Sequence, residues 1–399
     1  MTKPARRGVH RYRGAHAPWA CHFLIAEDNS LATLVKSQVQ KLSTADPDKV
    51  AVVAQLDTPK TRAKRYVLDR YRRFKLLPPK IGVDHNLDTG DPQVIINFLI
   101  AARRLRSADN LAVIASSHGT GFTDLAKFGR KRSRAMHGEP LKRPAWALGL
   151  DDTSRSFLDN NELTYALEYS YEHFGHRRPD ILGCDACLMA SVEAAHQLRR
   201  CAKYLVASQD NEPADGWPYE EILATFGADV EPPQAAVNIV REYARKTKDD
   251  DDATLSAVAL DLMDQLASAL DHLGTALLPL VKSNIRILAR AREDSRVVAN
   301  FDSIDLFGYA RAVGTRVAEA MPDDAARRAI RAAADSVTTT LKHAVIATSK
   351  DPEKSGAYGL SVYLPNSPVF DAYDDIPLSE AAPHWYDFVV SYGASRHLV

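Results

Sequence analysis

A cysteine and a histidine, each close behind a short apolar run, could together carry out nucleophilic catalysis. Cys187 comes shortly after Ile181 and Leu182, which read as the end of a buried strand. Apolar residues at helical spacing follow from Leu188 onward, so a helix is predicted to begin there. We therefore expect Cys187 at a strand-to-helix turn, where the positive end of the helix favours the thiolate. A single cysteine in such a turn is also often buried and inert, so a second group is needed.

His118 is that second group. Residues 111–115 form an unbroken apolar run typical of a buried parallel strand, and His118 and Gly119 follow it closely. Catalytic groups gather at the carboxyl ends of parallel strands, so His118 and Cys187 are predicted to share one sheet edge. Taken alone, a histidine after a strand is more often a capping or core residue than a catalytic one. As a pair, they suit thiol attack with an imidazole as proton carrier.

The cysteine pattern leaves an alternative open. Cys184 and Cys187 form a C-x-x-C pair, which could be a redox site or half of a zinc site. The chain has no second C-x-x-C, which argues against zinc. The pair also lies in mid-chain rather than after the first strand of a short domain, which makes a thioredoxin-like role the weaker hypothesis.

Composition indicates a soluble globular protein. The 399 residues contain 45% hydrophobic and 26% charged residues, and Lys+Arg and Asp+Glu are equal at 51 each. This balance favours neither nucleic acid nor an acidic partner. Residues 1–18 are basic and predict a solvated arm rather than a secretory signal. No run approaches the roughly 18 apolar residues of a membrane span, so we expect a cytoplasmic protein.

The order of predicted elements indicates a parallel α/β sheet. A strand at 19–26, a helix at 31–42 and a strand at 51–56 make a β-α-β unit. We expect one catalytic core over 19–260 and a helical C-terminal portion over 261–399, packed on the core and containing a returning strand. Further elements are expected as helices at 92–106, 159–172, 234–245, 263–288, 308–320, 325–341 and 385–392, and strands at 204–208, 255–260 and 359–364.

Residues 127–143 are too polar and irregular for a core. This stretch holds seven Lys or Arg residues and is predicted to be a long exposed loop between the histidine and the cysteine. A solvated basic loop is the simplest interpretation, and a nucleic-acid patch is weaker. Its exposed tip, where proteolysis is easiest, carries Arg130, Lys131, Arg132 and Arg134.

Five motifs in order resemble the clostripain family of cysteine peptidases, which shares a clan with caspases, legumains and gingipains. The most specific is D-A-C-L-M at 185–189. The others are F-L-I-A-E-D-N-S-L at 23–31, the segment 86–98 with G-D-P at 90–92, E-P-A-D-G-W-P-Y at 212–219 and G-L-S-V-Y-L-P at 359–365. The resemblance implies a caspase-like αβα sandwich, with a mostly parallel central sheet and helices on both faces.

The resemblance also implies a chemistry. It assigns Cys187 as nucleophile, His118 as acid and base, and the backbone N–H groups of Gly119 and Cys187 as the oxyanion hole. It further implies cleavage after Arg or Lys, selected by Asp185 and Asp215. The acidic pair would recognise the cation directly, although each Asp could also be a turn or cap residue. Enzymes of this kind often cut themselves between the histidine and the cysteine, which points to the 127–143 loop.

A metal requirement stays open at this stage. Clostripain itself depends on calcium, but not every relative does. Asp151, Asp152 and Asp159 lack the spacing of an EF-hand loop, so they are interpreted as loop and cap residues, with Asp159 or Asn160 capping a helix.

Three functions therefore remain as hypotheses. The first is a cytoplasmic Arg/Lys-directed endopeptidase whose protein substrate belongs to a stress or defence response. The second is a non-enzymatic caspase-like binding module, which the presence of both His118 and Cys187 argues against. The third is a C-x-x-C redox protein.

Overall fold

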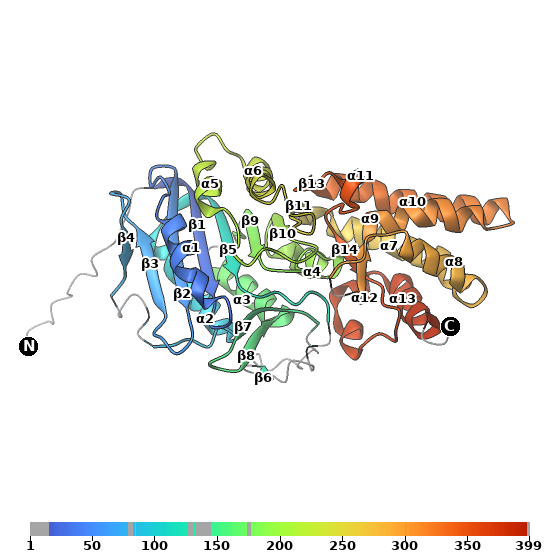
Figure 1. The fold of residues 1–399 in the computed structure, drawn as a ribbon, viewed down its shortest axis with the longest axis horizontal. Helices are drawn as coiled ribbons and strands as arrows, with labels where there is room; N and C mark the ends of the chain where they lie inside the picture. Colours follow the sequence, from blue (N-terminus) through green and yellow to red (C-terminus); the bar gives the residue numbers. More distant parts are fainter. Residues whose placement is uncertain are drawn as a thin grey trace, which may run out of the picture.

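A nine-stranded sheet forms the centre of the computed structural model, which describes residues 16–78, 83, 85–123, 125, 131–132, 145–173, 177–299 and 301–396 (Figure 1). Its middle strands are parallel, in the order β10 (Tyr204–Ala207), β9 (Ile181–Asp185), β5 (Ala108–Ser116), β1 (Ala17–Ala26) and β2 (Val50–Asp57). Antiparallel strands extend both ends: β11 (Ser256–Ala259) and β13 (Val345–Thr348) beyond β10, and β3 (Lys64–Leu68) and β4 (Phe74–Leu76) beyond β2. The predicted mostly parallel α/β sheet is confirmed.

Side chains of β1 alternate between two hydrophobic cores. Trp19, Phe23 and Ile25 pack in one core, whereas Ala20 and Leu24 pack in the other. Because both faces of the strand are covered, its sequence is almost entirely apolar, and even His22 is buried. Helices on the first face are α1 (Val35–Leu42), α5 (Tyr219–Ala224) and α6 (Pro232–Lys246). Helices on the second are α2 (Pro92–Leu105), α3 (Asn160–His173), α4 (Val192–Gln197) and α7 (Met263–Leu277).

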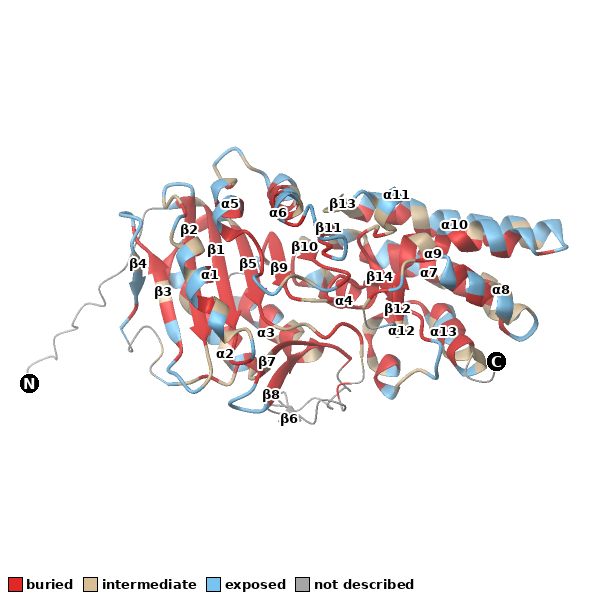
Figure 2. Cartoon of the chain, in the orientation of Figure 1, coloured by how far each residue is buried: buried red, intermediate tan, exposed pale blue. Residues whose placement is uncertain are grey.

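The C-terminal portion lies beyond the β13 end of the sheet (Figure 1). Its other helices are α8 (Val281–Glu293), α9 (Leu306–Ala312), α10 (Asp324–Ala344), α11 (Pro352–Ser355), α12 (Pro377–Ala381) and α13 (Pro383–Arg396). Buried residues of α7, α10 and α13 belong to the same core cluster as the second face of the sheet. Figure 2 shows this burial continuing from the strands into the helices, while the outer faces of α8 and α10 are exposed.

The returning strand differs from expectation. Residues 359–364 do contain a strand, β14 (Ser361–Tyr363), but it pairs with β12 (Ser303–Asp305) in a separate two-stranded sheet. The strand that rejoins the central sheet is β13, which follows α10 directly. Sequence pattern missed it because four apolar or small residues, V-I-A-T, continue a helix without a Gly or Pro to mark the change.

A small sheet lies next to the carboxyl ends of the central strands. Strands β7 (Ala147–Asp151) and β8 (Ser156–Asp159) form a hairpin, and β6 (Lys131–Arg132) pairs with β8. Two residues of the expected 127–143 loop therefore form a strand. Arg130, Arg134 and the rest of that loop lie outside the described residues. Within the described part of the chain, no helix is long and apolar enough to cross a membrane.

Candidate active site

Cys187 lies in a tight turn directly after β9, and this turn differs from the predicted one. Helix α4 begins at Val192, not at Leu188, and its N-cap is Ser191, whose hydroxyl accepts a hydrogen bond from Ala194 N at 3.1 Å. The physical reason is Leu188, whose φ of +64° is left-handed and cannot start a helix. Its N–H instead donates to the carbonyl of Asp210 at 3.0 Å. Cys187 is therefore not at a helix N-terminus.

The thiol of Cys187 is partly buried, and its pKa is raised. Burial is the main cause, and the carboxylates of Asp185 and Asp210 add to it. The N–H of Glu212 donates to Cys187 Sγ at 3.3 Å and offsets part of this effect. The expectation of a thiolate favoured by a helix dipole is therefore wrong. The shift favours the thiol over the thiolate.

His118 and Cys187 line the same cavity, as the strand order predicts. β5 and β9 are adjacent parallel strands, and their carboxyl ends open onto a cavity of about 100 Å³. Ser30 Oγ lies 2.8 Å from His118 Nε2 and fixes one side of the imidazole ring. The structure thus brings a nucleophile and a proton carrier together at one sheet edge, with Ser30 as a contact that the sequence did not reveal.

Gly119 places its backbone against the Cys187 turn. A Cβ at this position would meet the carbonyl oxygen of Cys187 at 2.2 Å, so only glycine fits. The neighbouring groups form a ladder with β7, through Thr120 N to Ala147 O and Gly149 N to His118 O, both 3.1 Å. These two hydrogen bonds flank Gly119, which forms a bridge with Leu148.

The two predicted acidic residues occupy different places. Asp185, at the end of β9, lines the cavity and accepts hydrogen bonds from the Trp217 N–H at 3.2 Å and from the Tyr219 hydroxyl. Asp215 does not line it. Its side chain is 56% exposed and pairs with Lys246 at 2.6 Å. The loop turns at Gly216, whose φ of +62° is left-handed, so the Asp215 side chain points to solvent.

Two further carboxylic acids line the cavity, and the sequence analysis missed both. Glu27 follows β1 and accepts hydrogen bonds from the Gln38 amide at 2.6 Å and the Ser116 hydroxyl at 3.1 Å. Glu212 accepts from Trp217 Nε1 at 3.0 Å and contacts the carboxyl group of Asp185. The strand-end rule that found His118 would also have found Glu27. Glu212 is the first residue of the E-P-A-D-G-W-P-Y motif, three residues before the predicted Asp215.

Burial gives these carboxyl groups unusual titration behaviour. It raises the pKa of Glu27 to about 7, and it raises the pKa of Asp185 despite its hydrogen bonds. The pKa of Glu212 is raised well above its ordinary value, first by burial and then by Asp185. Both shifts favour the protonated carboxyl group over the carboxylate. None of the described residues lining the cavity is a Lys or Arg.

Cys184 is poorly suited to a redox pair with Cys187. Its side chain is fully buried in the core, and burial raises the pKa of its thiol to about 12. A thiol without solvent access or thiolate character exchanges slowly. All four cysteines of the chain are free.

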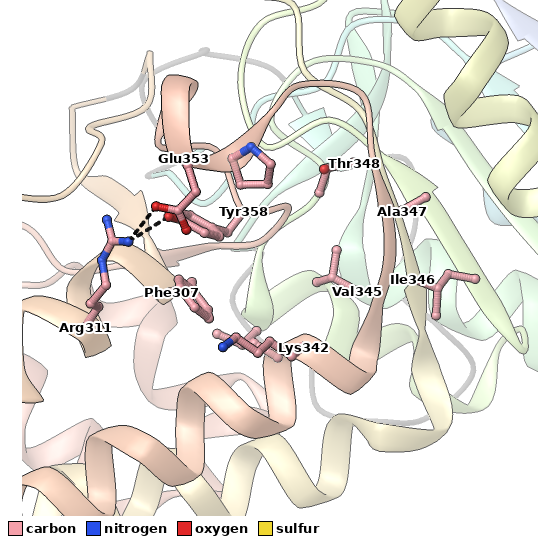
Figure 3. Close-up of a pocket in the computed structure, with 11 residues that line it drawn as sticks. Phe307, Arg311, Lys342, Val345, Ile346, Ala347, Thr348, Glu353 and Tyr358 are labelled. Atoms are coloured by element: carbon pink, nitrogen blue, oxygen red, sulfur yellow. Dashed lines mark hydrogen bonds and ion pairs between the residues drawn. The ribbon is translucent and has the colours of Figure 1, made fainter.

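A larger cavity, of about 450 Å³, lies in the C-terminal portion (Figure 3). Arg311 in this cavity contacts Glu353 at 3.0 Å and the Tyr358 hydroxyl at 2.9 Å. Its described lining contains neither cysteine nor histidine. The smaller cavity is the candidate active site because it is lined by both the cysteine and the histidine.

Comparisons with known proteins agree with this geometry. The sequence matches the profile of the Clostripain family over residues 24–368. An inactive zymogen C11 protease from Parabacteroides distasonis has a similar structure, with a TM-score of 0.64 and 18% identity, covering 92% of this chain and 98% of that one. A secreted C11 cysteine protease from Bacteroides thetaiotaomicron, in complex with an irreversible peptide inhibitor, also has a similar structure. The TM-score is 0.65 and the identity 17%, and the alignment covers 92% of this chain and 99% of that one. A sequence comparison with curated proteins finds no significant match.

The family match spans most of the chain and includes both the histidine and the cysteine strands. The structural similarity, at identities below 20%, independently supports the fold. Five ordered motifs, a shared cavity for His118 and Cys187, and the profile match lead to one conclusion. This chain belongs to the clostripain family and is a cysteine peptidase.

Proposed function

We propose that the protein is an endopeptidase that cleaves after Arg or Lys, with Cys187 as nucleophile and His118 as acid and base. Because burial raises the pKa of Cys187, the thiol must lose its proton as it attacks, and His118 in the same cavity is the group placed to accept it. His118 then protonates the leaving amine and later activates the water that releases the acyl group.

The backbone around Gly119 supports the oxyanion hole of this proposal. The N–H groups of Gly119 and Cys187 are the proposed donors to the negative oxygen of the tetrahedral intermediate. The close approach of the two backbones, which leaves no room for a Cβ at residue 119, supports placing both donors at the same reacting carbonyl.

One observation carries the specificity: three carboxylic side chains, Glu27, Asp185 and Glu212, line the same cavity as the cysteine. A cationic side chain entering it would meet at least one ionised carboxyl group in a largely desolvated setting, where charged hydrogen bonds are strong. Asp215, with its exposed side chain paired to Lys246, takes no direct part in this proposal.

The test uses peptides that differ only in the residue before the cut. Wild-type protein is expected to cleave Arg and Lys fluorogenic peptides and to leave Asp, Leu and Ala peptides intact. Cys187→Ala should abolish cleavage, while Cys184→Ala, a matched substitution of a buried cysteine outside the cavity, should retain it. Cleavage that persists in Cys187→Ala, or is lost equally in Cys184→Ala with the fold intact, would refute the assignment.

We further propose self-processing within 127–143, after Arg130, Lys131, Arg132 or Arg134. The similar Parabacteroides structure is that of an inactive zymogen, which makes a processing step reasonable for this chain. Intact-mass measurement of purified protein should show two fragments for wild type and one full-length chain for Cys187→Ala. A wild-type chain that stays whole while active would exclude processing as a requirement.

The cytoplasmic location and a stress- or defence-related protein substrate also remain proposals. Cells that express the active chain should contain cleaved proteins that are absent from cells expressing Cys187→Ala. N-terminal labelling of those fragments would identify both the substrate and the residue before each cut. Identical fragment sets in the two strains would argue against an internal substrate.

A further inference from the structure

The segment 208–212, directly after β10, lies against the turn that carries Cys187. Leu188 N donates to the carbonyl of Asp210 at 3.0 Å. Two residues further on, Glu212 N donates to Cys187 Sγ at 3.3 Å. Both the backbone of the turn and the thiol itself are therefore hydrogen-bonded to this segment, so its position sets the position of the cysteine.

The C-terminal portion holds the same segment from the other side. Arg296, between α8 and β12, donates from its guanidinium group to Asp210 Oδ2 at 2.9 Å, and Ala299 N donates to Asp210 Oδ1 at 3.1 Å. The amide of Gln209 donates to Asp305 Oδ2 at 3.2 Å. Two successive residues of the segment are thus fixed by side chains or backbone of the C-terminal portion.

The ion pair of Arg296 with Asp210 is largely removed from water. The two side chains are 16% and 8% exposed, whereas Asp252, 3.6 Å from the same guanidinium group, is 90% exposed and adds little. Another Arg296 nitrogen donates to Ser355 O at 3.2 Å, and its Nε is buried without a hydrogen-bond partner among the described residues. Arg296 also faces the buried carboxyl group of Asp305. A buried pair with an unused donor contributes little to stability, which favours a functional role.

Acidic side chains surround the thiol of Cys187. The titratable groups near it are Glu27, His118, Asp185, Asp210 and Glu212. Burial is the main cause of the raised pKa of Cys187, and the carboxylates of Asp185 and Asp210 add to it. Among the described residues, Arg296 forms the ion pair of Asp210, so it is the cation placed to offset one of these two carboxylates.

We propose that Arg296 is a positioning residue of the peptidase, which holds the segment 208–212 against the Cys187 turn and offsets the charge of Asp210. The proposal rests on Cys187 as the nucleophile of the proposed function. It gives the C-terminal portion a part in catalysis, because Arg296 lies between α8 and β12, whereas the histidine and the cysteine both follow strands of the central sheet.

Alkylation of Cys187 by iodoacetamide, followed against pH by mass spectrometry, tests the effect of each charge. Arg296→Met should raise the midpoint pH of the reaction by about 0.5–1, and Asp210→Asn should lower it by a similar amount, because the two side chains carry opposite charges. The variant with both substitutions should return to within about 0.3 of wild type, and so should Arg296→Lys, which keeps the charge. A merely structural role would not move the two midpoints in opposite directions.

Steady-state assays on an Arg peptide test the positioning. Arg296→Met should lower kcat by about 10- to 100-fold and leave KM within about threefold, because Arg296 does not line the cavity of Cys187. Arg311→Met is the matched control. It removes another ion-paired arginine of the C-terminal portion, which contacts Glu353 at 3.0 Å, and it should keep both kcat and the alkylation midpoint of wild type.

The outcomes separate this proposal from the proposed function. If Arg296→Met fails to fold, Asp210→Asn carries the test, and its midpoint must still fall. An unchanged midpoint in a folded variant, or shifts of the same sign in both variants, would overturn the role of Arg296. Alkylation needs no peptide cleavage, so opposite shifts in a chain that cleaves no peptide would support that role while the proposed function fails.

Discussion

Replacing Gly119 with alanine is the sharpest test of the proposed oxyanion hole. The new methyl carbon would lie 2.2 Å from the carbonyl oxygen of Cys187, whereas ordinary contacts begin at 3.4 Å. One of the two backbones must therefore move by about 1 Å. A displacement of this size at reacting groups costs about a hundredfold in rate, and loss of one oxyanion donor costs about a hundred- to a thousandfold. We expect kcat/KM for an Arg peptide to fall by about 10²–10³.

The assay must separate lost catalysis from lost folding. Gly227→Ala is the matched control, because its added Cβ would meet only Val230 Cγ2, at 4.0 Å. Its kcat/KM should stay within about twofold of wild type. Alkylation of Cys187 by iodoacetamide needs no oxyanion hole, so Gly119→Ala should react at a rate within a few-fold of wild type. A fall in kcat/KM of less than tenfold in a folded Gly119→Ala protein would refute the placement of this backbone at the reacting carbonyl.

Three further predictions concern the buried carboxyl groups. Glu212→Gln should lower kcat/KM for Arg peptides by about 10- to 100-fold in steady-state assays, the size of a charged hydrogen bond, with little change in Cys187 alkylation. Tyr219→Phe removes a donor that lowers the Asp185 pKa, so initial rates on Arg peptides should fall by about two- to tenfold and recover partly at higher pH. Burial raises the pKa of Glu193 from 4.5 to about 7. The protonated carboxyl group therefore stabilises the fold fully below pH 4.5, and this contribution to stability is lost as the pH rises through 7. Urea unfolding should show Glu193→Gln gaining up to about 3 kcal/mol over wild type between pH 4.5 and 8, and a constant difference would contradict this reasoning.

Long apolar runs made the central strands predictable. Strand β5 is buried on both faces, so its apolar sequence alone predicts a parallel strand. The consequence for the site was also predictable, since adjacent parallel strands carry their carboxyl ends to one edge. The juxtaposition of His118 and Cys187 follows from these two facts alone. Asp159 as cap of α3 was a local signal too, and its carboxylate accepts from Asn161 N and Glu162 N.

The details around the cysteine depended on backbone conformations that residue types do not reveal. Leu188 is apolar and fits a helical pattern, yet its left-handed φ delays α4 until Val192. Gly216 similarly turns its loop so that Glu212 lines the cavity and Asp215 does not. Both outcomes rest on contacts made across the sheet edge, such as the bond from Leu188 N to Asp210 O. Long-range contacts of this kind override the local preference for a helix or a turn, and the nearby sequence does not predict them.

The burial that raises the pKa values of the carboxyl groups supports the proposed preference for a cationic substrate. Three ionised acids in a small cavity would be costly, so in the empty cavity burial favours the protonated forms of Glu27, Asp185 and Glu212. An entering guanidinium or ammonium group replaces those protons, whereas a neutral side chain offers nothing in exchange. Asp185 also raises the Cys187 pKa, so a cation beside Asp185 offsets that effect on the thiol. Under the proposed specificity, binding of Arg or Lys would favour both occupancy of the cavity and ionisation of the Cys187 thiol, which would couple recognition of the substrate to catalysis.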